Sequence, residues 1–146
     1  MSTPAHQPTD APPPPTDRQP TVLMVEDSAG LAKLYSAFLA RESLQLIYAD
    51  NGRSALERLD AKLPDVMLLD LQLPDINGME VLKQVHDQQL PVVTVIMTAH
   101  GSVEVAVEAM RLGAVDFIEK PFDAQRLRVT MRNAIERLRP EVYLDF

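Results

Sequence analysis

The chain has 146 residues, about the length of one ordinary domain, and 46% of them are hydrophobic, enough for a single core. It contains no cysteine, which excludes disulfides and cysteine-based metal sites and fits a cytoplasmic location. The net charge of −7 argues against direct binding of nucleic acid, and no run of about 18 apolar residues is present to span a membrane.

The first 20 residues differ in composition from the rest of the chain. They hold seven of the twelve prolines, and no large aliphatic residue follows Met1. Such a segment has too little apolar surface to offset the entropy of folding. We therefore predict a disordered proline-rich leader over residues 1–20, a folded domain over residues 21–139, and a tail or linker over residues 140–146.

From residue 21 onward, short apolar runs alternate with longer amphipathic runs, a pattern typical of a parallel sheet covered on both faces. In chain order we expect strand 21–26, helix 28–42, strand 44–49, helix 52–61, strand 65–70, helix 76–88, strand 92–97, helix 102–112, strand 115–119 and helix 123–139. The first, third and fourth strands are almost continuously apolar and should be central. The second strand is interrupted by Gln45 and suits a position near the edge.

Local signals support these boundaries. Ser28, Ser102 and Asp123 stand where a side chain would cap the free N–H groups at a helix start. Five strand–helix repeats with right-handed crossovers predict an α/β fold: a doubly wound, flavodoxin-like (βα)5 parallel sheet with strand order 2-1-3-4-5.

Polar residues stand at the carboxyl ends of the predicted strands, where ligands bind in open parallel sheets. Glu26 and Asp27 end the first strand, Asp70 ends the third, Thr98 follows the fourth, and Lys120 follows the fifth. Acids at helix starts are common, so Glu26 or Asp27 alone would indicate little. The convergence of all five at one edge of the sheet predicts a site.

The residue types at this edge indicate phosphoryl transfer. Three clustered carboxylates repel one another and favour a hard divalent cation such as Mg²⁺, while the lack of histidine and cysteine argues against zinc or copper. Lys120 offers a positive charge for phosphate, Thr98 offers a small donor, and a central carboxylate can serve as nucleophile. Such a set would act by positioning and charge neutralisation.

Four separated segments then resemble the landmarks of response-regulator receiver domains, in the same order and spacing over residues 21–139. They are Val-Glu-Asp-Ser at 25–28, Leu-Leu-Asp-Leu-Gln-Leu-Pro-Asp at 68–75, Met-Thr-Ala at 97–99 and Glu-Lys-Pro-Phe at 119–122. The resemblance implies that Asp70 accepts a phosphoryl group from a sensor histidine kinase or a phosphotransfer protein. It also implies that Asp27, Asp70 and the Gln72 backbone carbonyl bind Mg²⁺, with Glu26 helping through water. Such a domain signals, and its only catalysis is its own phosphorylation.

The resemblance implies a switch as well. After phosphorylation the Thr98 hydroxyl would turn toward the phosphate and the Phe117 ring would move inward, remodelling the surface of the fourth helix, fifth strand and fifth helix. That surface is also a candidate homodimer face. A role in core packing alone explains Phe117 equally well. Lys120-Pro121 resembles the family's cis-prolyl peptide.

Residues 98–102 and 106–117 resemble, more particularly, the receivers of NtrC-type transcription activators, including the LuxO branch. Those proteins carry a AAA+ ATPase and a helix-turn-helix domain downstream, and no Walker motif is present here. The chain is then either a receiver from a longer activator, which we favour, or a free-standing receiver that acts through protein contacts alone.

Other readings remain open but weaker. A haloacid-dehalogenase-like phosphatase needs an acid two residues after the nucleophile, where this chain has Gln72. A flavodoxin-type binder of FMN or a nucleotide needs a phosphate-binding loop, and Glu26-Asp27 would repel phosphate. A degenerate receiver would not need all five site residues.

His6, His86 and His100 form no nucleophile or metal constellation. The arginines of the last helix, which fit a solvated or dimer face better than a DNA-binding one, are Arg126, Arg128, Arg132, Arg137 and Arg139.

Overall fold

Five strands and five helices alternate over residues 19–138, the part of the chain that this computed structural model describes. The strands are β1 (Thr21–Val25), β2 (Gln45–Ala49), β3 (Val66–Asp70), β4 (Val93–Thr98) and β5 (Asp116–Glu119). The helices are α1 (Ala29–Phe38), α2 (Gly52–Ala61), α3 (Gly78–Asp87), α4 (Val103–Arg111) and α5 (Ala124–Glu136). The predicted tail lies outside the described residues, as does the predicted leader apart from its last two residues.

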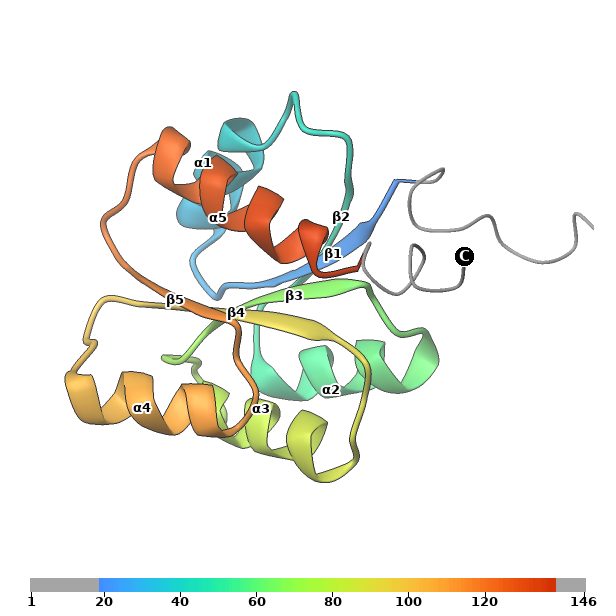
Figure 1. Cartoon of the computed structure of the whole chain (residues 1–146), viewed down its shortest axis with the longest axis vertical. Helices are drawn as coiled ribbons and strands as arrows, with labels where there is room; N and C mark the ends of the chain where they lie inside the picture. The colour runs from blue at the N-terminus through green and yellow to red at the C-terminus, as the bar shows by residue number, and fades with distance from the viewer. Residues whose placement is uncertain (1–18, 139–146) are drawn as a thin grey trace, which may run out of the picture.

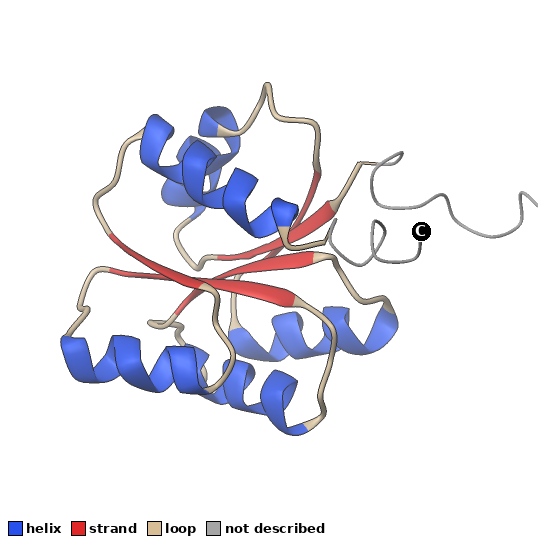
Figure 2. Cartoon of the chain, viewed as in Figure 1, coloured by secondary structure: helices blue, strands red, loops and turns tan. Residues whose placement is uncertain are grey.

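The strands form one parallel sheet in the order β2-β1-β3-β4-β5, which confirms the predicted doubly wound fold (Figure 2). The chain starts in the second position of the sheet, moves to one edge, and then crosses back over β1 to build the other side. Through this crossover β1 and β3 become neighbours in the sheet and form the site edge together. Their paired residues Leu23 and Met67 are 44 positions apart in the sequence.

Helices cover both faces of the sheet: α1 and α5 lie on one face, and α2, α3 and α4 on the other (Figure 1). Successive side chains of a strand point to opposite faces of the sheet, so each strand contributes residues to the hydrophobic core on both faces. In β1, Leu23 and Val25 enter the core beneath α2, α3 and α4, while Val22 and Met24 enter the core beneath α1 and α5. The unbroken apolar runs of the central strands are thus explained by burial on both faces.

The positions of the strands agree with their composition. All five residues of β3 are buried, as are four of the five in β1, whereas β2 at the edge exposes Gln45 and Tyr48. No helix over residues 19–138 is long and apolar enough to cross a bilayer.

Helix starts follow the predicted caps, but some boundaries differ. Ser28, Ser102 and Asp123 each accept a backbone N–H of the helix that they precede, at 2.8–3.1 Å. The expected helix over 28–42 ends at Phe38, and the chain then turns, with Glu42 of the turn paired to Arg132 of α5. The expected helix over 76–88 begins at Gly78, because the preceding asparagine is its cap.

Candidate functional site

Three carboxylates meet at the carboxyl ends of β1 and β3. One oxygen from each of Glu26, Asp27 and Asp70 lies within 4.8 Å of the others. Glu26 and Asp70 are each only 3% exposed, whereas Asp27 is open to solvent. The arrangement follows from the register, because β1 and β3 pair directly and both end at this edge (Figure 1). Two of the acids are therefore held inside the protein beside a third at its surface.

Lys120 is the counter-charge of the buried acids. Its Nζ donates to Asp70 Oδ2 at 2.6 Å and to Glu26 Oε1 at 2.5 Å. Its backbone N–H donates to the Thr98 carbonyl at 2.9 Å, which continues the pairing of β4 and β5, and its peptide bond to Pro121 is cis. The ammonium thus comes from the far strand of the site and bridges two carboxylates.

The pKa values in this cluster reflect burial and pairing together. Burial raises the pKa of Glu26, and the hydrogen bond from Lys120 only partly offsets it. Burial lowers the pKa of Lys120, but its hydrogen bonds to Asp70 and Glu26 outweigh this, so the pKa of the ammonium is raised above 10.5. Both pKa values are raised for a consistent reason. The Lys120 ammonium gains two carboxylate partners, whereas Glu26 has to share this one positive charge with Asp70.

The charge of the cluster fits a divalent cation. Three carboxylates around one ammonium leave an excess of two negative charges when all are ionised. All donors are oxygens, as Mg²⁺ prefers, and no histidine contributes among the described residues. Asp27, being exposed, can exchange water for an ion without further desolvation of the protein. The donor set and the missing charge therefore suit Mg²⁺.

An aromatic pair lies beneath the lysine. Lys120 Nζ stands 5.9 Å from the centroid of the Tyr35 ring, which is itself stacked on Phe122 with centroids 4.7 Å apart. A cation over a ring face gains electrostatic attraction. No local pattern in the sequence indicates this contact, because Tyr35 belongs to α1 and its partners Lys120 and Phe122 come from the other end of the chain.

The backbone after Asp70 is fixed by hydrogen bonds. The Gln72 N–H donates to Asp70 Oδ1 at 2.9 Å, and the Gly78 N–H donates to the Leu71 carbonyl at 2.8 Å. With Oδ2 bound to Lys120, both oxygens of Asp70 are engaged. The carboxylate therefore has one defined orientation.

Thr98 and Phe117 lie on the neighbouring strands. Asp70 pairs with Met97 in the sheet, so the buried Thr98 is one residue beyond it, and its Oγ accepts the His100 N–H at 3.1 Å. Phe117 is half-buried and packs against the core on the α4 side. A Cβ placed on Gly101 would lie 2.9 Å from the Phe117 ring, so the loop after Thr98 closes over that ring.

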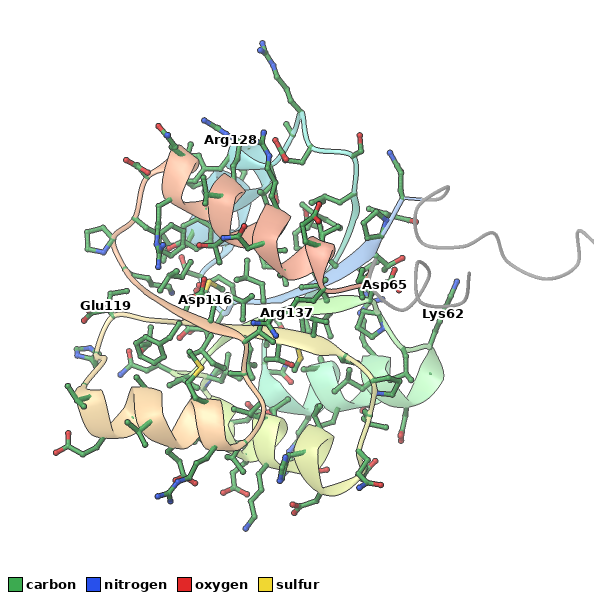
Figure 3. All side chains as sticks on the ribbon, viewed as in Figure 1. Lys62, Asp65, Asp116, Glu119, Arg128 and Arg137 are labelled. Carbon is green, nitrogen blue, oxygen red and sulfur yellow. The ribbon has the colours of Figure 1, made fainter. Side chains whose placement is uncertain are left out.

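Of the residues set aside in the sequence, His86 lies away from the cluster, whereas His6 and Arg139 fall outside the described residues. His86 is in the last turn of α3, at the opposite end of the sheet from the carboxylates. Figure 3 marks the two ends, with Glu119 at the site end and Asp65 at the other. Arg132 binds both oxygens of Glu42 at 2.9 Å, and this lowers the pKa of Glu42, while Arg128 reaches the Phe38 carbonyl. These arginines tie α5 to α1 and its following turn.

Comparison with known proteins places this arrangement in a family. The response regulator receiver domain matches residues 22–132. The luminescence regulatory protein LuxO of Vibrio campbellii is 48% identical over 114 residues, and the regulatory protein AtoC of Escherichia coli is 34% identical over 115 residues. These matches cover 78% and 79% of this chain but 25% of each relative. The chain thus spans about a quarter of the length of these curated relatives.

Solved structures agree with the sequence matches. The signal receiver domain of a LuxO repressor protein from Vibrio parahaemolyticus superposes with a TM-score of 0.84 at 37% identity. The match covers 88% of this chain and 98% of that one. NtrX from Brucella abortus matches with a TM-score of 0.78 at 30% identity, over 87% of this chain and 29% of that one.

Proposed function

Since the chain belongs to the response regulator receiver family of signalling domains, we propose that Asp70 accepts a phosphoryl group in a Mg²⁺-dependent reaction. The observation that carries this proposal is the position of the Lys120 ammonium, 2.6 Å from Asp70 in a cluster of oxygen donors short of two positive charges. A buried acid that ends a strand, with its orientation fixed and a cation beside it, is suited to in-line transfer.

We assign Asp27, Asp70 and the Gln72 backbone carbonyl as the residues that would hold Mg²⁺, with Glu26 acting through water. When bound, the ion neutralises charge on the cluster and on an incoming phosphate. The excess of two negative charges in the cluster supports this assignment. The proposed donor is the phosphohistidine of a sensor histidine kinase or of a phosphotransfer protein.

In the proposed reaction an Asp70 oxygen attacks phosphorus, the phosphorus–nitrogen bond of the donor breaks, and the imidazole leaves and takes up a proton. Lys120 releases Asp70 Oδ2 and pairs with an oxygen of the transferred group, since an ammonium can turn freely between acceptors. The Thr98 hydroxyl, now the acceptor of the His100 N–H, rotates to donate to the same group. The chain itself supplies the nucleophile, the counter-charge and the hydroxyl donor.

We further propose that this rotation, with inward movement of Phe117, switches the surface formed by α4, β5 and α5. On that surface α4 exposes Val103 (77%), Val107 (50%) and Met110 (44%), an apolar stripe one helical turn apart. The neighbouring elements carry charges of both signs: Asp116 and Glu119 belong to β5, and Arg137 follows the end of α5 (Figure 3). An apolar centre with charges of both signs suits a homodimer contact.

The proposed output is transcription activation through an NtrC-type AAA+ domain in the same protein, in the cytoplasm. Its support is the similarity to LuxO and AtoC, regulators about four times as long as the matched part. The alternative is a free-standing receiver that acts by protein contacts alone. In both cases the folded unit is the segment over residues 21–139, between a proline-rich leader and a tail or linker.

Intact-protein mass spectrometry after incubation with acetyl phosphate and Mg²⁺ tests the phosphoacceptor. We expect a mass gain of one phosphoryl group that is lost in Asp70→Asn and without Mg²⁺, but kept in Asp60→Asn, which changes an exposed acid of α2. A folded wild-type protein that gains no mass under any condition would overturn the proposal and favour a pure interaction module. A gain retained in Asp70→Asn would reassign the acceptor.

A further inference from the structure

The segment between β3 and α3 carries one of the proposed ligands and has no regular structure of its own. It begins after Asp70, includes Gln72, and reaches α3 at Gly78. At the start of the segment, the Gln72 N–H donates to the Asp70 carboxylate. At its end, the Gly78 N–H donates to the Leu71 carbonyl. What holds the middle of this segment decides how well Gln72 is placed.

Asp75 provides that middle attachment. Its Oδ1 accepts the backbone N–H groups of Gly52 and Ile76, both at 2.8 Å, and its Oδ2 accepts the Arg53 N–H at 2.9 Å. Gly52 and Arg53 are the first residues of α2, and they lie 23 and 22 positions before Asp75 in the sequence. The carboxylate is exposed to solvent but makes three directed bonds, two of them to another element.

The contact completes the start of α2. Asn51 caps the helix by accepting the Ser54 N–H at 2.8 Å, and Asp75 takes the two N–H groups before it. Unpaired N–H groups at a helix start attract negative charge, so this is a favourable place for a carboxylate. The approach is close, because a Cβ on Gly52 would stand 2.7 Å from the Ile76 Cδ1.

The anchor is rigid and the connection to the ligand is short. α2 is fixed in the core by Ala55 and Leu59, both buried. Between Gln72 and Asp75 stand only Leu73, which packs on the same core, and Pro74, whose ring fixes φ. Restraining Asp75 therefore restrains the backbone of Gln72.

We propose that Asp75 is a positioning residue for cation binding, which holds the β3–α3 segment against α2 in the conformation that binds Mg²⁺. This inference rests on the proposed function, because it concerns the same metal site. The pKa of Asp75 supports a permanent attachment: desolvation raises it, but the N–H groups of Arg53, Gly52 and Ile76 lower it to about 2. The carboxylate is thus ionised throughout the neutral range.

Isothermal titration with Mg²⁺ alone tests the inference, on the wild-type protein and on Asp75→Ala, Asp75→Asn and Asp60→Asn. We expect Asp75→Ala to weaken Mg²⁺ binding about tenfold, as loss of a partner that orients a ligand typically does. Asp75→Asn keeps one oxygen acceptor, so its Mg²⁺ affinity should lie between those of wild type and Asp75→Ala. Asp60→Asn removes the same charge from α2 and should bind like wild type. Circular dichroism identifies the temperatures at which each variant is folded.

A second readout separates positioning from general loss of structure. At saturating Mg²⁺ the ion itself orders the segment, so the phosphorylation rate of Asp75→Asn with acetyl phosphate should return to that of wild type. Unchanged Mg²⁺ affinity in both Asp75 variants, beside a wild type that binds, would overturn the inference and leave the proposed function standing. An equal loss in Asp60→Asn would overturn it too, since charge alone would then be the cause. Wild type that binds no Mg²⁺ would overturn both.

Discussion

Gly78→Ala tests whether backbone packing at the start of α3 fixes the site. A Cβ on Gly78 would stand 2.7 Å from the Leu71 Cα and closer still to the Asp70 carbonyl oxygen. Both atoms belong to the backbone, so neither can rotate away as a flexible side chain would. The substitution must therefore displace either α3 or the residue that we propose as phosphoacceptor.

The size of the effect follows from two opposing contributions. Alanine is the better helix former by about 1 kcal/mol, and Gly78 has no positive φ that would penalise it. Overpacking costs about 1–3 kcal/mol, and a clash with backbone belongs at or above the upper end. We expect a net loss of about 2 kcal/mol, which lowers the urea midpoint by roughly 1 M if the slope is about 2 kcal/mol per M.

Gly30→Ala is the matched control, since Gly30 is also in the first turn of a helix but exposed. A Cβ there would meet only the Ser28 Oγ, at 3.9 Å. This variant should be more stable than wild type by up to about 1 kcal/mol. Urea unfolding measures the stability of both variants, and titration with Mg²⁺ shows whether the proposed metal site is intact. Equal stability of Gly78→Ala and Gly30→Ala, with unchanged Mg²⁺ binding, would refute the packing argument.

Three further substitutions have defined outcomes. Lys120→Met leaves two buried carboxylates unpaired and should cost about 3 kcal/mol; Mg²⁺ should then raise its melting temperature more than that of wild type, and an equal rise would contradict the charge argument. Asp75 has a pKa of about 2 against an ordinary 3.8, so its ionised form stabilises the fold above pH 4 and this contribution is lost as the pH falls through 2. Asp75→Asn should flatten the fall of the urea midpoint between pH 4 and 2, and an unchanged slope would argue against it. Gly101→Ala should displace the Phe117 ring, seen as shifted aromatic resonances in NMR spectra, whereas unshifted resonances would show that the loop yields instead.

Much of the fold could be predicted because each element carries its own signal. Apolar runs of strand length, amphipathic runs of helix length and the caps Ser28, Ser102 and Asp123 are local features. The edge position of β2 followed from Gln45 in the same way. Helix ends were less accurate. α1 ends at Phe38, and Glu42 in the turn beyond it pairs with Arg132, 90 positions later in the chain, a contact that no local pattern indicates.

For the candidate site, the identity of the residues could be predicted from the sequence but their contacts could not. Strand boundaries and residue types are local properties, so the residues at the carboxyl ends of the strands, including the three acids and Lys120, could be identified from the sequence. The contacts of these residues became visible only in the folded chain: Lys120 lies between Glu26 and Asp70, Tyr35 lies beneath Lys120, and Asp75 binds the start of α2. Each of these contacts joins elements that are distant along the chain, and their geometry depends on sheet order and helix packing, which no local pattern of residues encodes.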